Sequence, residues 1–126
     1  MDIREDILYT KEHEWVAADH GKATVGITDY AQGELGDIVF LELPHVGSTI
    51  KQMEPFGTIE AVKAVSSLYS PVSGVIAEVN TRLEEQPDLI NSDPYGEGWI
   101  VKIDMKDQAE LSALLSSHQY RELIGG

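Results

Sequence analysis

The sequence contains no cysteine. Disulfide bonds, zinc–thiolate sites and cysteine nucleophiles are therefore excluded, and any redox chemistry requires a group that is added to the chain. Basic residues are also scarce, because 9 lysines and arginines stand against 22 aspartates and glutamates, for a formal charge of −13. This charge argues against binding to nucleic acid or to anionic membranes. It fits a protein that docks on basic partner surfaces, or one that its charge simply keeps soluble.

The usual catalytic and targeting motifs are missing too. The histidines, at positions 13, 20, 45 and 118, lack metal-ligand spacing, and no nucleophile elbow or phosphate-binding loop occurs. We therefore expect no metal site and no catalytic residue. No apolar run reaches the length of a membrane helix, and the N-terminus resembles neither a signal nor a transit peptide. We expect a cytoplasmic protein, or one of the mitochondrial matrix if the source is eukaryotic.

Short β-type segments with glycine and proline between them dominate the chain. The length of 126 residues predicts a single domain over residues 1–126. The expected strands cover residues 15–18, 22–27, 37–43, 56–62, 64–69, 75–79 and 99–103. In the third of these, strict alternation would place Val39 and Leu41 on one face and Ile38 and Phe40 on the other. This pattern predicts a mainly β barrel or sandwich.

Helices are few and short. Thr28 is expected to cap a helix that ends near Gly36, and Thr81 is expected to form a capping box with Glu84. The C-terminal helical segment, about 107–124, is predicted to begin at an Asp107 cap, with Glu110 in its first turn, and to break near residues 116 and 117 into two short helices, because its apolar residues fall on two different faces.

Lys63 is the most unusual residue of the sequence, because it is a lone lysine between two strand-like runs. If these runs pair, Lys63 lies at the tip of a tight hairpin, where a solvated amine on a rigid frame suits enzymatic modification. A turn lysine without a role is the alternative. The surrounding E-x-x-K-A, with S-P-x-S-G downstream, resembles the hairpin of lipoyl and biotinyl carrier domains. Biotinyl domains usually have methionine on both sides of the lysine, whereas Val62 and Ala64 stand here, which speaks against a biotin carrier.

The order and spacing of many further motifs resemble the H-protein family of the glycine cleavage system, over nearly the whole chain. These motifs are Tyr9, His13-Glu14-Trp15-Val16, Gly26-Ile27-Thr28-Asp29, Ala31-Gln32, Leu35-Gly36, Leu43-Pro44, Gly47, Phe56-Gly57, the run from Glu60 to Ala64, Ser70-Pro71, Gly74, Glu78-Val79-Asn80, Leu89-Ile90-Asn91, Pro94-Tyr95 and Gly98-Trp99. The resemblance implies a barrel-sandwich hybrid of short antiparallel strands with a few short helices, the C-terminal ones included.

The same resemblance implies a non-catalytic lipoyl carrier. Lipoate would be bound covalently to Lys63, in a hairpin of about residues 56–74, with Glu60, Val62, Ala64 and Gly74 as hairpin or recognition residues. The carrier would take an aminomethyl group from a pyridoxal-phosphate-dependent glycine decarboxylase (P protein) to an aminomethyltransferase (T protein), and then its dihydrolipoyl group to dihydrolipoyl dehydrogenase (L protein). A lipoate ligase or an octanoyl or lipoyl transferase would modify the lysine, and a monomer is expected.

The resting groove of the lipoyl arm is the part of the site on which the sequence departs from the family. Glu14 matches the family's groove carboxylate, which would hold a cationic amine, and a plain surface acid is the alternative. Ser67 stands where an acidic residue is common and Glu34 where histidine is frequent. A relay that passes lipoyl or octanoyl groups to other enzymes is the rival function. A small stand-alone enzyme is disfavoured, because the sequence offers neither a nucleophile nor a metal site.

Overall fold

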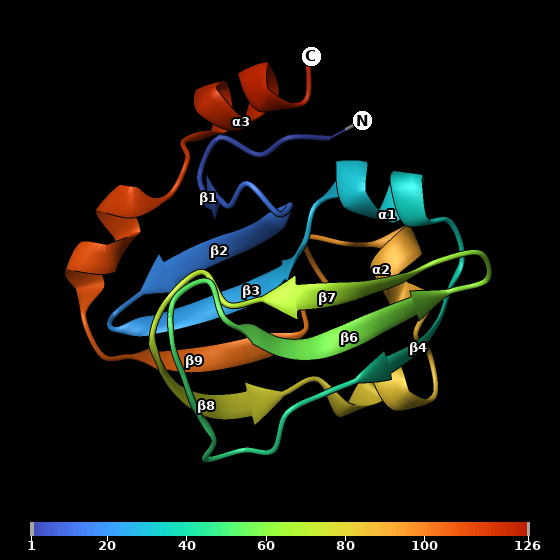
Figure 1. The fold of residues 1–126 in the computed structure, drawn as a ribbon, viewed down its shortest axis with the longest axis horizontal. Helices are drawn as coiled ribbons and strands as arrows, with labels where there is room; N and C mark the ends of the chain where they lie inside the picture. The colour runs from blue at the N-terminus through green and yellow to red at the C-terminus, as the bar shows by residue number, and fades with distance from the viewer. Residues whose placement is uncertain (1, 126) are drawn as a thin grey trace.

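The computed structural model, which describes residues 2–125, consists of two antiparallel sheets that lie one over the other (Figure 1). The larger sheet has six strands in the order β1-β2-β3-β9-β8-β5, and the smaller has three in the order β4-β6-β7. The strands are β1 (Leu8–Tyr9), β2 (Glu14–Asp19), β3 (Lys22–Ile27), β4 (Ile38–Glu42), β5 (Thr49–Ile50), β6 (Pro55–Ala61), β7 (Val65–Tyr69), β8 (Gly74–Val79) and β9 (Val101–Met105). The mainly β prediction is confirmed.

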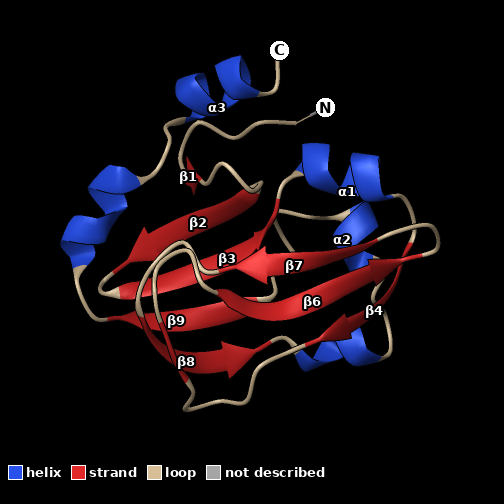
Figure 2. Cartoon of the chain, in the orientation of Figure 1, coloured by secondary structure: helices blue, strands red, loops and turns tan. Residues whose placement is uncertain are grey.

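Short helices lie around the edges of the two sheets (Figure 2). They are α1 (Asp29–Leu35), α2 (Leu89–Ser92), α3 (Ser117–Leu123) and the 3₁₀ helices η1 (Thr81–Glu84) and η2 (Gln108–Ala113). The predicted break between two C-terminal helices is confirmed, and α3 packs beside the N-terminal segment (Figure 1). Within residues 2–125, no helix is long and apolar enough to cross a membrane.

Capping side chains set the bounds of these helices. Thr28 accepts a hydrogen bond from the backbone N–H of Ala31 and begins α1, and Gly36 ends it at φ +82°, as predicted. The predicted capping box at Thr81 is wrong, because Asn80 is the N-cap of η1 and accepts from the N–H of Arg82. An asparagine side chain caps a helix as well as threonine does, which shifts the start by one residue.

The predicted alternation in β4 is also wrong. Ile38 and Leu41 are buried, while Val39 and Phe40 are both exposed. The pairing of β4 with β6 shifts register between Ile38 and Phe40, which is a β-bulge. The extra residue turns two consecutive apolar side chains outward, so the smaller sheet has an apolar outer face near one end.

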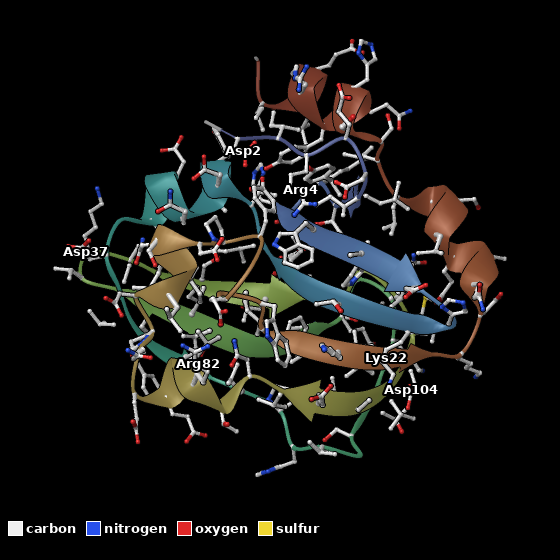
Figure 3. All side chains as sticks on the ribbon, turned by 180° about the vertical axis from the view of Figure 1, so that it is seen from behind. Asp2, Arg4, Lys22, Asp37, Arg82 and Asp104 are labelled. Atoms are coloured by element: carbon white, nitrogen blue, oxygen red, sulfur yellow. The ribbon has the colours of Figure 1, made fainter. Side chains whose placement is uncertain are left out.

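Apolar side chains from both sheets form the main core, which includes Val25, Ile59, Leu68, Ile76, Ile100 and Ile103. A second cluster joins the chain termini, and in it the buried rings of Tyr9 and Tyr120 stack with centroids 4.6 Å apart. On the far side, Lys22 and Asp104 form an ion pair between the neighbouring strands β3 and β9 (Figure 3). The cluster around Tyr120 fixes α3 against the rest of the molecule.

Candidate functional site

Lys63 lies at the exposed tip of the hairpin between β6 and β7. The last rung of the ladder joins Glu60 and Val65, and the N–H of Ala61 then donates to the carbonyl oxygen of Ala64 at 2.7 Å. The N–H of Val62 donates to the carbonyl oxygen of Asp37 at 3.1 Å, which ties the tip to the chain that enters β4. The backbone on both sides of the lysine is thus held by hydrogen bonds, while the lysine side chain is exposed.

The lysine side chain extends past the end of α1. A Cβ atom at Gly36 would lie 3.4 Å from Lys63 Cε, so the lysine stem passes close to the glycine that ends the helix. Around the tip, Val62 is 75% exposed and Val65 is 68% exposed. Phe40, Glu60 and Val65 lie side by side across the three strands, so two exposed apolar side chains flank Glu60 next to the lysine. Asp37 lies at the same end of the molecule (Figure 3).

A groove of about 250 Å³ runs between β2, α1 and the β6–β7 hairpin. Its lining residues are Glu12, His13, Glu14, Ile27, Tyr30, Ala31, Glu34, Leu35, Ile59, Ser66, Ser67 and Leu68. Three wider hollows, of about 700, 600 and 360 Å³, lie at the β5–β8 edge, beside the N-terminal segment and on α1. None of the three contains Glu14, whereas the groove beside the hairpin contains Glu14 together with residues of β6 and β7, the two strands that lead to Lys63.

Glu14 is the buried acid of the groove, with only 1% of its surface exposed. The hydroxyl of Thr10 donates to its Oε1 at 2.6 Å, and the N–H of Tyr69 donates to its Oε2 at 3.2 Å. Burial raises the pKa of Glu14 to about 7, although these two hydrogen bonds act to lower it. A positive charge close to such an acid would favour its ionised form.

The structure brings most of the predicted site residues together. Glu60, Val62 and Ala64 surround Lys63 at the hairpin, and the groove contains Glu14 with Glu34 and Ser67. Gly74 does not lie at the tip: it begins β8 and pairs with Ile50 and Met105 in the larger sheet. Tyr30 and Ser66 also line the groove and were not predicted, because they come together only through packing between α1 and β7. Among the residues described, no cluster of possible metal ligands is found.

The comparisons with known proteins agree with this geometry. The family model described as "Glycine cleavage H-protein" matches residues 7–125. The chain belongs to the glycine cleavage H-protein family. A glycine cleavage system H protein of Rubrobacter xylanophilus is 56% identical over 119 residues, which are 94% of this chain and 92% of the relative. One of Staphylococcus carnosus is 50% identical over 125 residues, 99% of each chain.

A solved structure of an H protein supports the fold. The crystal structure of a glycine cleavage system H protein from Mycobacterium marinum is 39% identical and superposes with a TM-score of 0.91, covering 98% of this chain and 100% of that one. The predicted fold class is thus confirmed. H proteins are non-catalytic carriers that bear a lipoyl group on a lysine and move intermediates between the P, T and L proteins, so the predicted carrier function, cofactor and these partners are confirmed.

Proposed function

We propose that Lys63 is the lysine that bears the lipoyl group and that the groove beside Glu14 is where the resulting arm rests. One observation supports this most directly: Lys63 is exposed at a hydrogen-bonded hairpin tip, and its stem passes the helix α1 that forms one wall of the groove. By contrast, Lys22 and Lys102 lie on strands, where each forms an ion pair with a neighbouring acid.

The chemistry of the residues present fits such an arm. Acylation of Lys63 would remove the positive charge of its amine, so the arm could lie on apolar surface that an ammonium avoids. The groove offers such surface on Ile27, Ile59 and Leu68. When bound, the lipoyl group supplies a disulfide for reversible reduction and a sulfur to which cargo is attached, which is chemistry that a chain without cysteine cannot supply itself.

Glu14 is the residue suited to hold a protonated amine presented in the groove. Its raised pKa means that a large fraction of the acid is neutral at pH 7 when no cation is near. A positive charge nearby favours the carboxylate, so arrival of an ammonium would lower the pKa of Glu14 and release a proton. The fixed donors on Oε1 and Oε2 then hold the carboxylate in place while Ile59 and Leu68 limit the access of water.

Recognition by the modifying enzyme is assigned to the exposed tip. A lipoate ligase or an octanoyl or lipoyl transferase has to cover Lys63, and it would meet Glu60, Val62 and Ala64 on the same hairpin. Gly74 would act indirectly, by supporting the base of the hairpin. We further propose a monomeric, cytoplasmic carrier made of one domain, whose charge of −13 speeds encounters with basic partner surfaces.

The experiment is acylation of the unmodified chain by a purified lipoate ligase with lipoate and ATP, followed by intact-mass measurement. The wild type should gain one lipoyl group, Lys63→Arg should gain none, and the control Lys51→Arg should gain one. The lipoylated wild type should support glycine-dependent bicarbonate exchange by the P protein, and Lys63→Arg should not. Lipoylation of Lys63→Arg, or exchange supported by a chain that carries no lipoyl group, would overturn the proposal.

A further inference from the structure

Three hydrogen-bonded side chains connect the C-terminal helix to the wall of the groove. His13 lines the groove, and its Nδ1 lies 2.9 Å from the hydroxyl oxygen of Tyr120 in α3. The same hydroxyl lies 2.7 Å from Oγ1 of Thr28, the N-cap of α1. His13 also has φ +72°, a backbone region that is costly for residues other than glycine. Such strain is retained where the surroundings hold a side chain in one required position.

The hydrogen bonds among Thr28, Tyr120 and His13 can run in only one direction if every buried donor among these three side chains is to have an acceptor. Thr28 is fully buried, and its Oγ1 already accepts from the N–H of Ala31, so Tyr120 is its only acceptor within the described structure. Thr28 therefore donates to Tyr120, and Tyr120 donates to Nδ1 of His13. The reverse direction would leave the Thr28 hydroxyl hydrogen unpaired, a large penalty for a buried group.

We propose that Tyr120 is a positioning residue that holds His13 as the neutral tautomer with its proton on Nε2, on the wall of the groove that receives the arm. This inference rests on the proposed role of that groove. Protonation of Nδ1 would leave the Tyr120 hydroxyl facing a second donor or, if that hydroxyl turned toward Thr28, would leave the Thr28 hydrogen without an acceptor. The C-terminal helix would thus support the groove through His13, although no residue of α3 lines the groove itself.

The packing around Tyr120 supports this role. Tyr120 is fully buried and stacks on Tyr9, and Ser116 with Gln119 forms a capping box that begins α3. Burial raises the pKa of Tyr120 to about 12, so its hydroxyl keeps its proton and remains a donor. The residue is thus held rigidly in the protonation state that the proposal requires.

The titratable groups around His13 explain why a neutral imidazole is needed there. Glu12 and Glu14 adjoin it in the chain, and Tyr30 and Glu34 of α1 line the same groove. Burial lowers the pKa of His13, against the attraction of Glu12 and Glu34, which acts to raise it. A positive charge on His13 would compete with a cationic cargo for Glu14. A neutral imidazole avoids that competition.

The test is long-range ¹H–¹⁵N NMR of the histidine rings in the unmodified chain, titrated from pH 5 to 8. In the wild type, His13 should show the neutral tautomer with its proton on Nε2. In Tyr120→Phe, which loses the donor, the two tautomers should mix, and the pKa of His13 should rise by roughly one unit. Tyr9→Phe is the matched control: the Tyr9 hydroxyl donates to the Arg4 carbonyl oxygen and, among the described residues, has no hydrogen bond to His13, Thr28 or Tyr120, so the His13 signals should stay as in the wild type.

A wild type in which neutral His13 carries its proton on Nδ1 would overturn the proposal without any variant, and so would a Tyr120→Phe spectrum identical to the wild type. Because these spectra need no lipoyl group, they remain decisive even if Lys63 proves not to be the modified lysine. In the lipoylated protein loaded by the P protein, ammonia should be lost several-fold faster from Tyr120→Phe than from Tyr9→Phe near pH 6. Equal rates there would contradict the link between Tyr120 and the groove.

Discussion

Substitution of Glu14 by glutamine should stabilise the protein at alkaline pH. The rise of the pKa of Glu14 from its ordinary value of 4.5 to about 7 means that, between these pH values, the folded state keeps a proton that the unfolded chain has released. Stability therefore falls as pH rises through this window, and above it the buried carboxylate costs about 3 kcal/mol, at roughly 1.4 kcal/mol per pKa unit. Glutamine is neutral throughout, so this cost disappears.

The substitution also has a cost of its own. Both oxygens of Glu14 accept hydrogen bonds, from Thr10 and from Tyr69, and glutamine has only one oxygen to accept them. Loss of one such bond costs about 1 kcal/mol at every pH. We therefore expect Glu14→Gln to exceed the wild type by about 2 kcal/mol at pH 8, and to lie within about 1 kcal/mol of it at pH 5.

Urea unfolding of the unmodified wild type and variant, at intervals from pH 5 to 8, measures the difference in their free energies of unfolding at each pH. The control is Glu85→Gln, at an exposed position, which should follow the wild-type curve. Parallel pH curves for Glu14→Gln and the wild type would refute the assigned burial effect, as would a variant that is less stable at pH 8.

Three further predictions concern charge and local structure. Turnover of the lipoylated protein by the P and L proteins should slow as the salt concentration is raised, because the acidic surface aids encounter with these partners. Rates that do not change with salt concentration would contradict this prediction. Gly36→Ala should destabilise by about 1–2 kcal/mol, since Gly36 has φ +82°, whereas Gly33→Ala within α1 should be neutral or stabilising; equal melting temperatures would contradict this. Glu110→Ala should lower stability by about 1–2 kcal/mol, because Glu110 accepts from the N–H and the hydroxyl of Ser73, and unchanged urea unfolding would contradict that role.

The sequence predicted those features that depend on neighbours along the chain. The cap at Thr28, the end at Gly36 and the tip at Lys63 each follow from a short motif whose geometry is local. The Asp107 cap of η2 is likewise local. Glu110, three residues later, instead bonds to Ser73 from a distant turn, which no local rule contains.

Features set by pairing between distant segments were not predictable in this way. The bulge that exposes both Val39 and Phe40 depends on the register of β4 against β6. The contact of Tyr120 with His13 depends on the docking of α3 against the N-terminal segment, 107 residues away in the chain. Glu14 was identified from the family pattern, but its burial and its two donors became evident only from the fold.

We propose above that the amine of Lys63 is the attachment point of the lipoyl group. Peptide mapping by tandem mass spectrometry, on the protein isolated from its native host, measures this most directly. We expect one lipoyl group on the peptide that contains Lys63 and none on peptides containing the other lysines. A lipoyl group on a different lysine, with Lys63 unmodified, would contradict it.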